Sequence, residues 1–203
     1  THRFHAALRG RLAFRRFGGS DTIDLGPTRI DMPSTAPQPA YRFGPQEEDR
    51  VRQWTGAIGY EGDWGGVGSL SAGLQKSDYT KNIGLPGLKQ RIAATPWLGN
   101  INAALQLGPR TQVYGGFVTG LEESGIAPIN AVNRNEALPA IITRQVDAGL
   151  RTSVGPLTLV AGVFRLSKPY FNLDADGRFG ALGTVSSRGI EASLAGPISD
   201  SLS

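Results

Sequence analysis

Cysteine is absent from the 203-residue chain, and this absence excludes a disulfide framework and any zinc site with cysteine ligands. Long apolar runs are also missing. Only 39% of the residues are hydrophobic, and no stretch approaches the roughly 18 consecutive apolar residues of a transmembrane helix. The strands of a membrane β-barrel escape this second exclusion, because they alternate apolar and polar residues and never form a long apolar run.

Histidine is nearly absent too, and the groups that could carry catalysis form no recognisable site. His2 and His5 are the two histidines, and their spacing places them on opposite faces of an extended strand. The sequence Gly-x-Ser-x-Gly of a nucleophile elbow does not occur. Residues 65–68 are glycine-rich but join two expected strands, whereas a phosphate-binding loop leads into a helix. We therefore expect no enzymatic activity and no catalytic residues.

A short acidic segment resembles the start of a calcium-binding loop. Asn172, Asp174 and Asp176, followed by Gly177, have the spacing of its first ligands. Gly183 occupies the position that should supply the bidentate glutamate, so the match fails at the strongest ligand. We interpret the segment as a turn and expect no metal site.

The net charge is +4 and the isoelectric point about 9.7, values that could indicate a nucleic-acid-binding protein. The basic residues are spread along the chain instead of forming a stripe or a recognised motif. We therefore expect no nucleic-acid partner.

Glycine and proline are plentiful, with 28 and 13 residues, which is typical of a chain with many turns. Between the turns, apolar and polar residues alternate. In residues 1–17, Phe4, Leu8 and Leu12 occupy even positions, whereas Arg3, Arg9, Arg11 and Arg15 occupy odd ones. A period of two over this length predicts a strand longer than is usual in soluble domains, and long enough to cross a bilayer with tilt.

The same alternation recurs and predicts about eight strands in an antiparallel, up-and-down meander. The expected strands cover residues 1–17, 52–60, 69–79, 97–107, 112–119, 145–151, 157–164 and 187–194. Long connections over residues 18–50, 80–95, 120–143 and 167–186 alternate with turns at 63–66, 107–110, 154–156 and 196–199. Short periplasmic turns and long extracellular loops have this rhythm in outer-membrane barrels.

Two tryptophans fit the height of such a barrel. Trp54 and Trp64 lie ten positions apart on one face, which corresponds to roughly 23 Å along the membrane normal for a strand tilted by about 45°. The apolar band of these barrels is about 25 Å tall, with aromatic residues at both edges. The alternative is that the two tryptophans are unrelated, since aromatic girdles are a statistical tendency.

Five segments resemble the barrel region of TonB-dependent siderophore receptors in their order and spacing. They read GLEESGIAP (120–128), AVNRNEALPA (131–140), TRQVDAGL (143–150), KPYFNLD (168–174) and RGIEASLAG (188–196). The resemblance implies a bacterial outer-membrane receptor for ferric siderophore uptake, energised through TonB. In that family a barrel of 22 strands surrounds an N-terminal plug. Residues 1–203 would then be part of the barrel domain, without the plug and the remaining strands.

The resemblance also implies what the chain binds. The partners would be a ferric siderophore or similar chelate and the outer-membrane lipid, with TonB and the plug reached only through parts of the protein outside this sequence. No cofactor is expected, since iron would enter only as the bound chelate.

Anionic chelates with aromatic donors call for arginines and aromatic rings at the receptor mouth. The candidates near the extracellular strand ends are Arg15, Tyr41, Arg42, Tyr79, Tyr170 and Phe171. Tyr79 could instead belong to an aromatic girdle or touch a plug, and the inward arginines could pair with acids of a plug.

Two other hypotheses compete with a receptor fragment. Eight strands can close into a complete small outer-membrane barrel with a structural or adhesion role. A soluble, sugar-binding β-sandwich is the other, but its strands would be shorter and its long loops would not share one end. The chain begins inside a strand pattern and stops just after a turn, so we expect it to be part of a longer polypeptide.

Overall fold

Nine β-strands and no helix make up the part of the chain that the computed structural model describes, residues 1–20, 24, 26–27, 31 and 40–197. None of these residues belongs to a helix that could cross a membrane. The strands are β1 (His2–Phe17), β2 (Glu47–Asp63), β3 (Gly68–Leu85), β4 (Leu88–Ala94), β5 (Trp97–Gln106), β6 (Thr111–Glu122), β7 (Ile141–Val154), β8 (Leu157–Leu173) and β9 (Phe179–Ala195).

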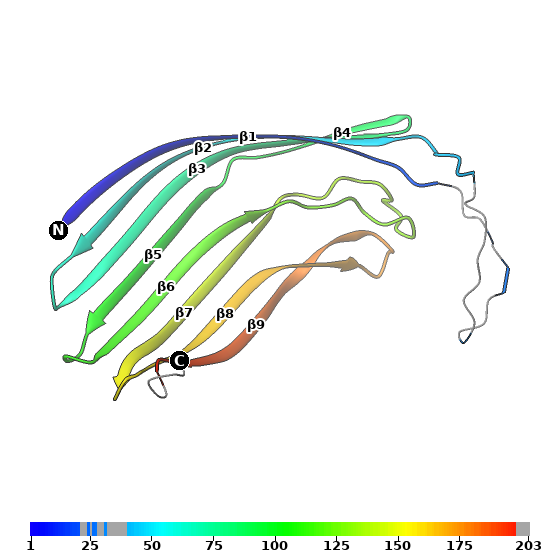
Figure 1. The fold of residues 1–203 in the computed structure, drawn as a ribbon. Coiled ribbons are helices and arrows are strands. Elements are labelled where there is room, and N and C mark those ends of the chain that lie inside the picture. Colours follow the sequence, from blue (N-terminus) through cyan, green and yellow to red (C-terminus); the bar gives the residue numbers. More distant parts are fainter. Residues whose placement is uncertain (21–23, 25, 28–30, 32–39, 198–203) are drawn as a thin grey trace.

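The strands form one antiparallel sheet in the order β1-β2-β3-β5-β6-β7-β8-β9, drawn in Figure 1. The meander therefore contains eight strands along its path, as the alternation predicts. The ninth strand, β4, pairs with the C-terminal half of β3, whereas β5 pairs with the N-terminal half of β3. Together, β4 and β5 accompany β3 along its length and are separated only by Thr95 and Pro96.

The prediction of a long connection without strands is wrong for two of the four segments. Residues 80–95 belong largely to a β3–β4 hairpin that turns at Gly87, and residues 167–186 belong largely to a β8–β9 hairpin. The alternation is hard to recognise in the first hairpin because its sense reverses. Ile83 and Ile92 point to the inner face, whereas Asn82 and Arg91 point outward. In this hairpin, therefore, the outer side chains are polar and the inner side chains are apolar.

The other connections agree with the prediction. Tight turns follow β2, β5 and β7 at residues 64–67, 107–110 and 155–156, and residues 123–140 form a long connection between β6 and β7. The connection between β1 and β2 is also long, although many of its residues lie outside the described part. Of the turn expected at 196–199, Ile198 and Ser199 lie outside it too.

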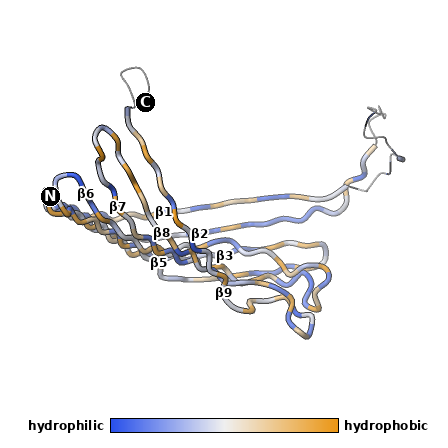
Figure 2. Tube along the Cα trace, turned by 90° about the horizontal axis from the view of Figure 1, so that it is seen from below, coloured by the Kyte–Doolittle hydropathy of each residue, from blue (hydrophilic) through white to orange (hydrophobic). Residues whose placement is uncertain are grey.

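The outer face of the sheet carries a continuous apolar band, and Figure 2 shows the alternating hydropathy along the strands. The register brings Leu105, Val113 and Leu150 side by side, and likewise Val163 and Ile190. Exposed fractions reach 77% for Leu8, 65% for Ile58 and 84% for Ile190. Apolar side chains exposed over a whole face of a sheet mark a surface that meets another apolar phase.

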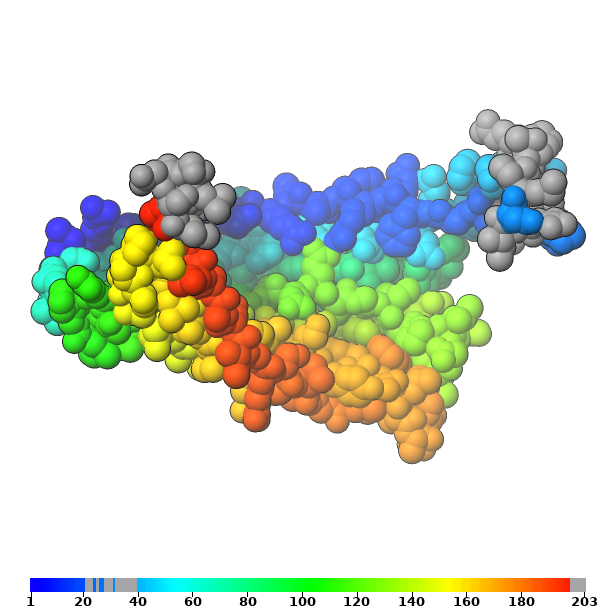
Figure 3. Space-filling model, turned by 60° about the horizontal axis from the view of Figure 1, so that its bottom comes forward, coloured from blue at the N-terminus to red at the C-terminus, as the bar shows by residue number. Residues whose placement is uncertain are grey.

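The opposite face is concave. Arg11 on β1 reaches Glu123, which follows β6, although three strands of the sheet lie between β1 and β6. Such a contact requires the sheet to curve toward this face, as Figure 1 shows, and Figure 3 shows the hollow between the two edges. Strands β1 and β9 do not pair with each other within the described residues, so the sheet is an open arc.

Candidate functional site

Polar side chains line the concave face of β1, β2 and β3. The register places Arg9, Thr55 and Ser77 in one row and Arg11, Gln53 and Tyr79 in the next. The hydroxyls of Thr55 and Ser77 are 2.6 Å apart, and the Gln53 side-chain amide donates to Ser77 at 3.0 Å. A hollow of about 420 Å³ lies against these residues. The inner wall is therefore polar, hydrogen-bonded and positively charged.

Two arginines of this wall hold one carboxylate. Arg11 Nη2 donates to Glu123 Oε1 at 2.8 Å, and Arg15 Nη2 donates to Glu123 Oε2. The Glu123 side chain is 22% exposed, whereas both arginines are about half exposed. Burial alone would raise the pKa of Glu123, but the hydrogen bonds and charges of Arg15 and Arg11 outweigh it, so the pKa is lowered. The two arginines thus form an anion-binding pair that an acid of the chain itself occupies.

Tyr79 lies beside this pair, on the same face. Its side chain is 2% exposed, and its hydroxyl is the one buried side-chain polar atom of the described residues without a hydrogen-bond partner. Glu123, Arg11 and Arg15 are among the charged groups that act on this hydroxyl. A buried hydroxyl without a partner costs roughly 1 to 3 kcal/mol. The Tyr79 hydroxyl is therefore a hydrogen-bond donor without an acceptor, next to the two arginines.

The inner loop, by which we mean residues 123–140, lies against the same end of the inner face as Tyr79. Lys81 Nζ lies 3.0 Å from the Asp49 carboxylate and donates to the backbone oxygen of Ser124 at 3.2 Å. Ala127, Ala131 and Leu138 of this loop are buried, as are Val51, Ile83 and Ile92 of the strands. Almost all of the buried apolar side chains in the described part gather where the loop meets β2, β3 and β4.

Two side-chain amides attach the inner loop at its two sides. On β4, Gln90 donates to the backbone oxygen of Asn135 and accepts from the backbone N–H of Ala137, both at 2.5 Å. At the start of β9, Asn133 donates to the Phe179 oxygen at 3.0 Å and accepts from its N–H at 2.8 Å. The loop therefore reaches from the β3–β4 hairpin to the β8–β9 hairpin.

An ion pair strengthens the second attachment. Arg178 Nη2 contacts both oxygens of the Glu136 carboxylate at 2.7 Å, and the Val132 N–H donates to the Gly177 oxygen at 2.9 Å. These contacts come from a charged side chain, a side-chain amide and the backbone, so no single substitution removes them all.

The six residues predicted to bind a ligand do not form one cluster. Arg15 and Tyr79 lie together on the inner wall beside Glu123. Tyr41 and Arg42 are exposed in the connection between β1 and β2. Tyr170 accepts a hydrogen bond from Asn172, and Phe171 stacks on Phe179 with ring centroids 6.4 Å apart. A ligand contact stays a prediction for all six.

Sequence reasoning did not identify the partner of the inner arginines. The acid that binds Arg11 and Arg15 is Glu123, 112 and 108 residues away along the chain. Glu123 lies within a segment that carries the family resemblance, but its neighbour Glu122 is chemically identical. The curvature of the sheet brings this end of β6 to the arginines, and the sequence does not indicate which of the two carboxylates reaches them.

The acidic segment that resembles a calcium loop forms the turn between β8 and β9. Asp174 Oδ1 accepts the N–H groups of Asp176 and Arg178 at 3.0 and 2.8 Å. The carboxylate is thereby used to cap its own turn, as the sequence interpretation predicts. Across the described residues, no group of three or more His, Asp or Glu side chains could hold a metal ion.

No protein-family model and no curated protein sequence matches the chain. Solved structures do. The ferric-catecholate import receptor Fiu from E. coli K12 aligns with 98% of this chain and 33% of its own, at a TM-score of 0.79 and 14% identity. BauA, the ferric preacinetobactin receptor of Acinetobacter baumannii, aligns with 82% of this chain and 26% of its own, at a TM-score of 0.67 and 20% identity.

The ferripyoverdine receptor of the Pseudomonas aeruginosa outer membrane, solved with ferripyoverdine bound, matches 78% of this chain and 22% of its own, at a TM-score of 0.61 and 14% identity. These likenesses show that the chain has the fold of part of such receptors. The 203 residues span about a quarter to a third of the Fiu and BauA chains.

Proposed function

We propose that this chain is part of the barrel wall of an outer-membrane receptor that takes up ferric siderophores. The rest of the polypeptide would supply the remaining strands, the plug and the contact with TonB. The fold that it shares with three siderophore receptors supports this proposal, and so does the apolar outer band, which suits lipid. The alternative of a complete eight-stranded barrel requires its edge strands to pair, and β1 and β9 do not within the described residues.

The observation that carries the proposal is the pair Arg11 and Arg15 on the concave face, with Tyr79 beside them. Two guanidinium groups aimed at one carboxylate are suited to bind an anionic oxygen ligand bidentately. Tyr79 adds an aromatic ring and a free hydroxyl. An anionic, oxygen-rich chelate offers partners for all three groups. The iron is cargo held by the chelate, so it needs no protein ligand.

Without a ligand, the Glu123 carboxylate occupies the position on Arg11 and Arg15 that an acidic group of the chelate would take. A chelate that reaches the inner wall competes with Glu123 for Arg11 and Arg15, and the inner loop loses its attachment at this point when the chelate wins. Movement of the loop would then uncover Tyr79. The exchange conserves the number of charge-assisted hydrogen bonds to the arginines, so the competition depends on how well each carboxylate fits.

The test measures binding and uptake of a ferric chelate by the complete receptor, with surface abundance held equal. We expect Arg11→Gln with Arg15→Gln to weaken binding by roughly tenfold or more per arginine. Glu123→Gln should instead strengthen it, because the competing carboxylate is removed. Arg3→Gln with Arg110→Gln is the matched control, since it removes the same charge far from the pair. If the arginine variants bind like the control, the concave wall does not recognise the chelate.

A further inference from the structure

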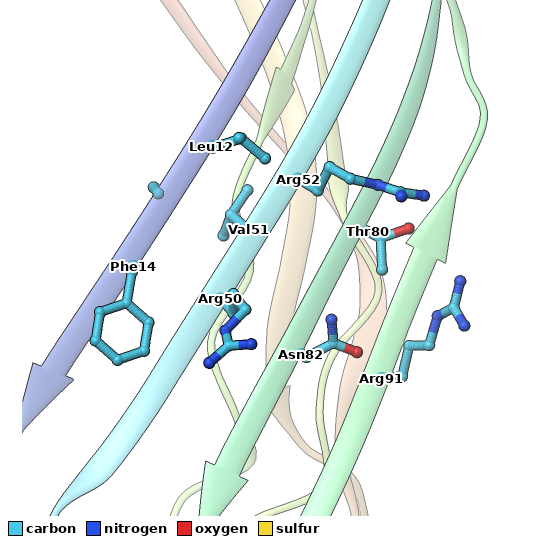
Figure 4. Close-up of a pocket in the computed structure, with 9 residues that line it drawn as sticks. Leu12, Phe14, Arg50, Val51, Arg52, Thr80, Asn82 and Arg91 are labelled. Carbon is cyan, nitrogen blue, oxygen red and sulfur yellow. The ribbon is translucent and has the colours of Figure 1, made fainter.

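A second group of basic residues lies on the outer face of the sheet, on the side that the inner wall does not use. We define the outer arginine cluster as Arg50 and Arg52 on β2 with Arg91 on β4. The register places Arg50, Asn82 and Arg91 in one row and Arg52 and Thr80 in the next. Figure 4 shows Arg52 reaching from β2 toward Thr80 on β3, with Arg50 beside β2 between Phe14 and Asn82. A groove of about 730 Å³ runs between these side chains.

The cluster lies just beyond the edge of the apolar band. Along the outer face of β2, Ile58 and Trp54 are followed by Arg52 and Arg50. At about 3.3 Å per residue and a tilt near 45°, Arg52 stands roughly 5 Å, and Arg50 roughly 9 Å, beyond Trp54 along the membrane normal. Tryptophan prefers the level where lipid tails meet headgroups. The arginines therefore lie at the level of the headgroups.

A second boundary marker supports this level. On the next strands, Lys76 Nζ lies 5.0 Å from the centre of the Trp97 ring, and Trp97 is 63% exposed on the outer face. Lysines near the end of an apolar span direct their charge toward the interface. Lys76 and Trp54 thus mark the same edge on β3 and β2.

The arginines of the cluster are free to bind an anion. All three are exposed, and none forms an ion pair within the described part of the chain. Arg50 stacks on the Phe14 ring at 5.4 Å, which orders the guanidinium plane without using its N–H groups. Among the described residues of β2 and β3, the acids on this face are Glu48, 4.0 Å from Arg16, and Asp78 near the Trp54 level. They leave the cluster with a net positive charge.

We propose that the outer arginine cluster binds the phosphate groups of a lipid headgroup in the outer leaflet. Its guanidinium groups lie on two strands separated by β3, so one phosphate does not satisfy them all, and a headgroup with more than one phosphate fits best. Leu12 and Phe14 of β1, which pair with Arg52 and Arg50, form the apolar side of the groove at the same level. This proposal needs the sheet to face a membrane, but it does not need the receptor to bind a siderophore.

The experiment uses the complete receptor, extracted from its outer membrane in mild detergent. Phosphorylated lipid that stays bound is quantified by native mass spectrometry. An arginine near an anionic leaflet contributes roughly fivefold to lipid affinity, so loss of three should lower it roughly a hundredfold. We therefore expect Arg50→Gln, Arg52→Gln and Arg91→Gln together to lose the bound lipid. The triple control Arg3→Gln, Arg110→Gln and Arg151→Gln should keep it.

Three results would overturn the proposal. The first is equal lipid retention by the cluster variant and the control. The second is complete displacement of the lipid by millimolar inorganic phosphate, because the site would then recognise the free anion and not a headgroup at a membrane. The third is retention of lipids without phosphate only. Folding of each variant is checked on the same samples by circular dichroism of the sheet, and ferric chelate binding is measured separately. Loss of lipid from a folded variant therefore tests this proposal whether or not the protein binds a chelate.

Discussion

Several aromatic side chains occupy the space beside glycines of nearby strands. Trp54 covers Gly10, Phe164 covers Gly189, and Tyr114 covers both Gly149 and Gly162. A Cβ atom at Gly10 would stand 2.8 Å from the Trp54 ring, and one at Gly189 would stand 2.5 Å from the Phe164 ring. Because glycine has no side chain, it leaves room on the sheet for the aromatic residue. The glycine content of the chain thus reflects packing in the strands as well as turns.

We predict that Gly149→Ala destabilises the folded barrel by about 1 to 3 kcal/mol, the range for overpacking. The new methyl group would stand 2.5 Å from the Ala161 backbone oxygen and 2.5 Å from the Tyr114 hydroxyl. Gly56→Ala is the control, because nothing lies within 4 Å of its Cβ position. The midpoint of urea unfolding in lipid vesicles measures both. Equal midpoints for the two variants would contradict the role of Tyr114.

The attachment of the inner loop through Glu123 depends on pH. The pKa of this carboxyl lies below its ordinary value of 4.5, so its contribution is present above that value. The contribution is lost as the pH falls through the lowered pKa. We predict that a spin label at Gly125→Cys, the only cysteine in these 203 residues, becomes more mobile as the pH falls below 4.5 through the lowered pKa of Glu123; the site is two positions from Glu123 and has open space at its Cβ position.

Glu123→Gln should make the label more mobile at neutral pH and remove this acid transition. The control is Glu122→Gln, which changes the neighbouring exposed carboxylate and should leave the transition in place. A transition of the same size in all three proteins would assign it to another group.

The alternation of apolar and polar residues predicts some parts of the strands and misses others. Inside the apolar band every second residue faces lipid in the proposed setting, so the alternation is clear, as in residues 1–17. Beyond the band the outer face becomes polar and the inner face meets the loop, so the pattern reverses at Ile83 and Ile92. A search for alternation alone therefore stops a strand at the edge of the band. The site was less predictable still, because Glu123 meets Arg15 only through the curvature of the sheet.

The difference between the faces gives a prediction for charged substitutions. Ile58→Arg puts a charge near the middle of the apolar band, between Trp54 and Trp64, and should destabilise the barrel by about 2 to 4 kcal/mol. Ser71→Arg places the same side chain on the inner face, opposite Glu61, and should be tolerated. Folding yield into vesicles measures both changes. Similar yields would contradict the assignment of one face to lipid, and a lower yield for Ser71→Arg would mean that the two faces are assigned the wrong way round.

The sheet as a whole has two long open edges. Strand β1 has 16 residues and β9 has 17, and among the described residues each has a paired neighbour on one side only. Unpaired strand edges add further strands or associate with other chains, and the apolar band lacks a cover in water.

We predict that residues 1–203 alone do not form a stable monomer in detergent-free buffer. Analytical ultracentrifugation should find aggregates, and thermal unfolding should lack a sharp, reversible transition. The complete receptor in detergent is the control, since its β1 and β9 edges would be paired. A monodisperse monomer that unfolds and refolds cooperatively would contradict both the membrane setting and the open barrel wall.

The two attachments of the inner loop have a geometrical meaning for the arc. The inner loop binds Gln90 of β4 on one side and Phe179 of β9 on the other. It therefore fixes the distance between these two strands, and this distance limits how strongly the sheet between them curves. The opposite ends of the strands carry only tight turns in the described part, so their radius depends on sheet twist alone. In the proposed barrel, the curvature of this part of the wall at the loop end would therefore depend on the inner loop, whereas its curvature at the opposite end would depend on the strands alone.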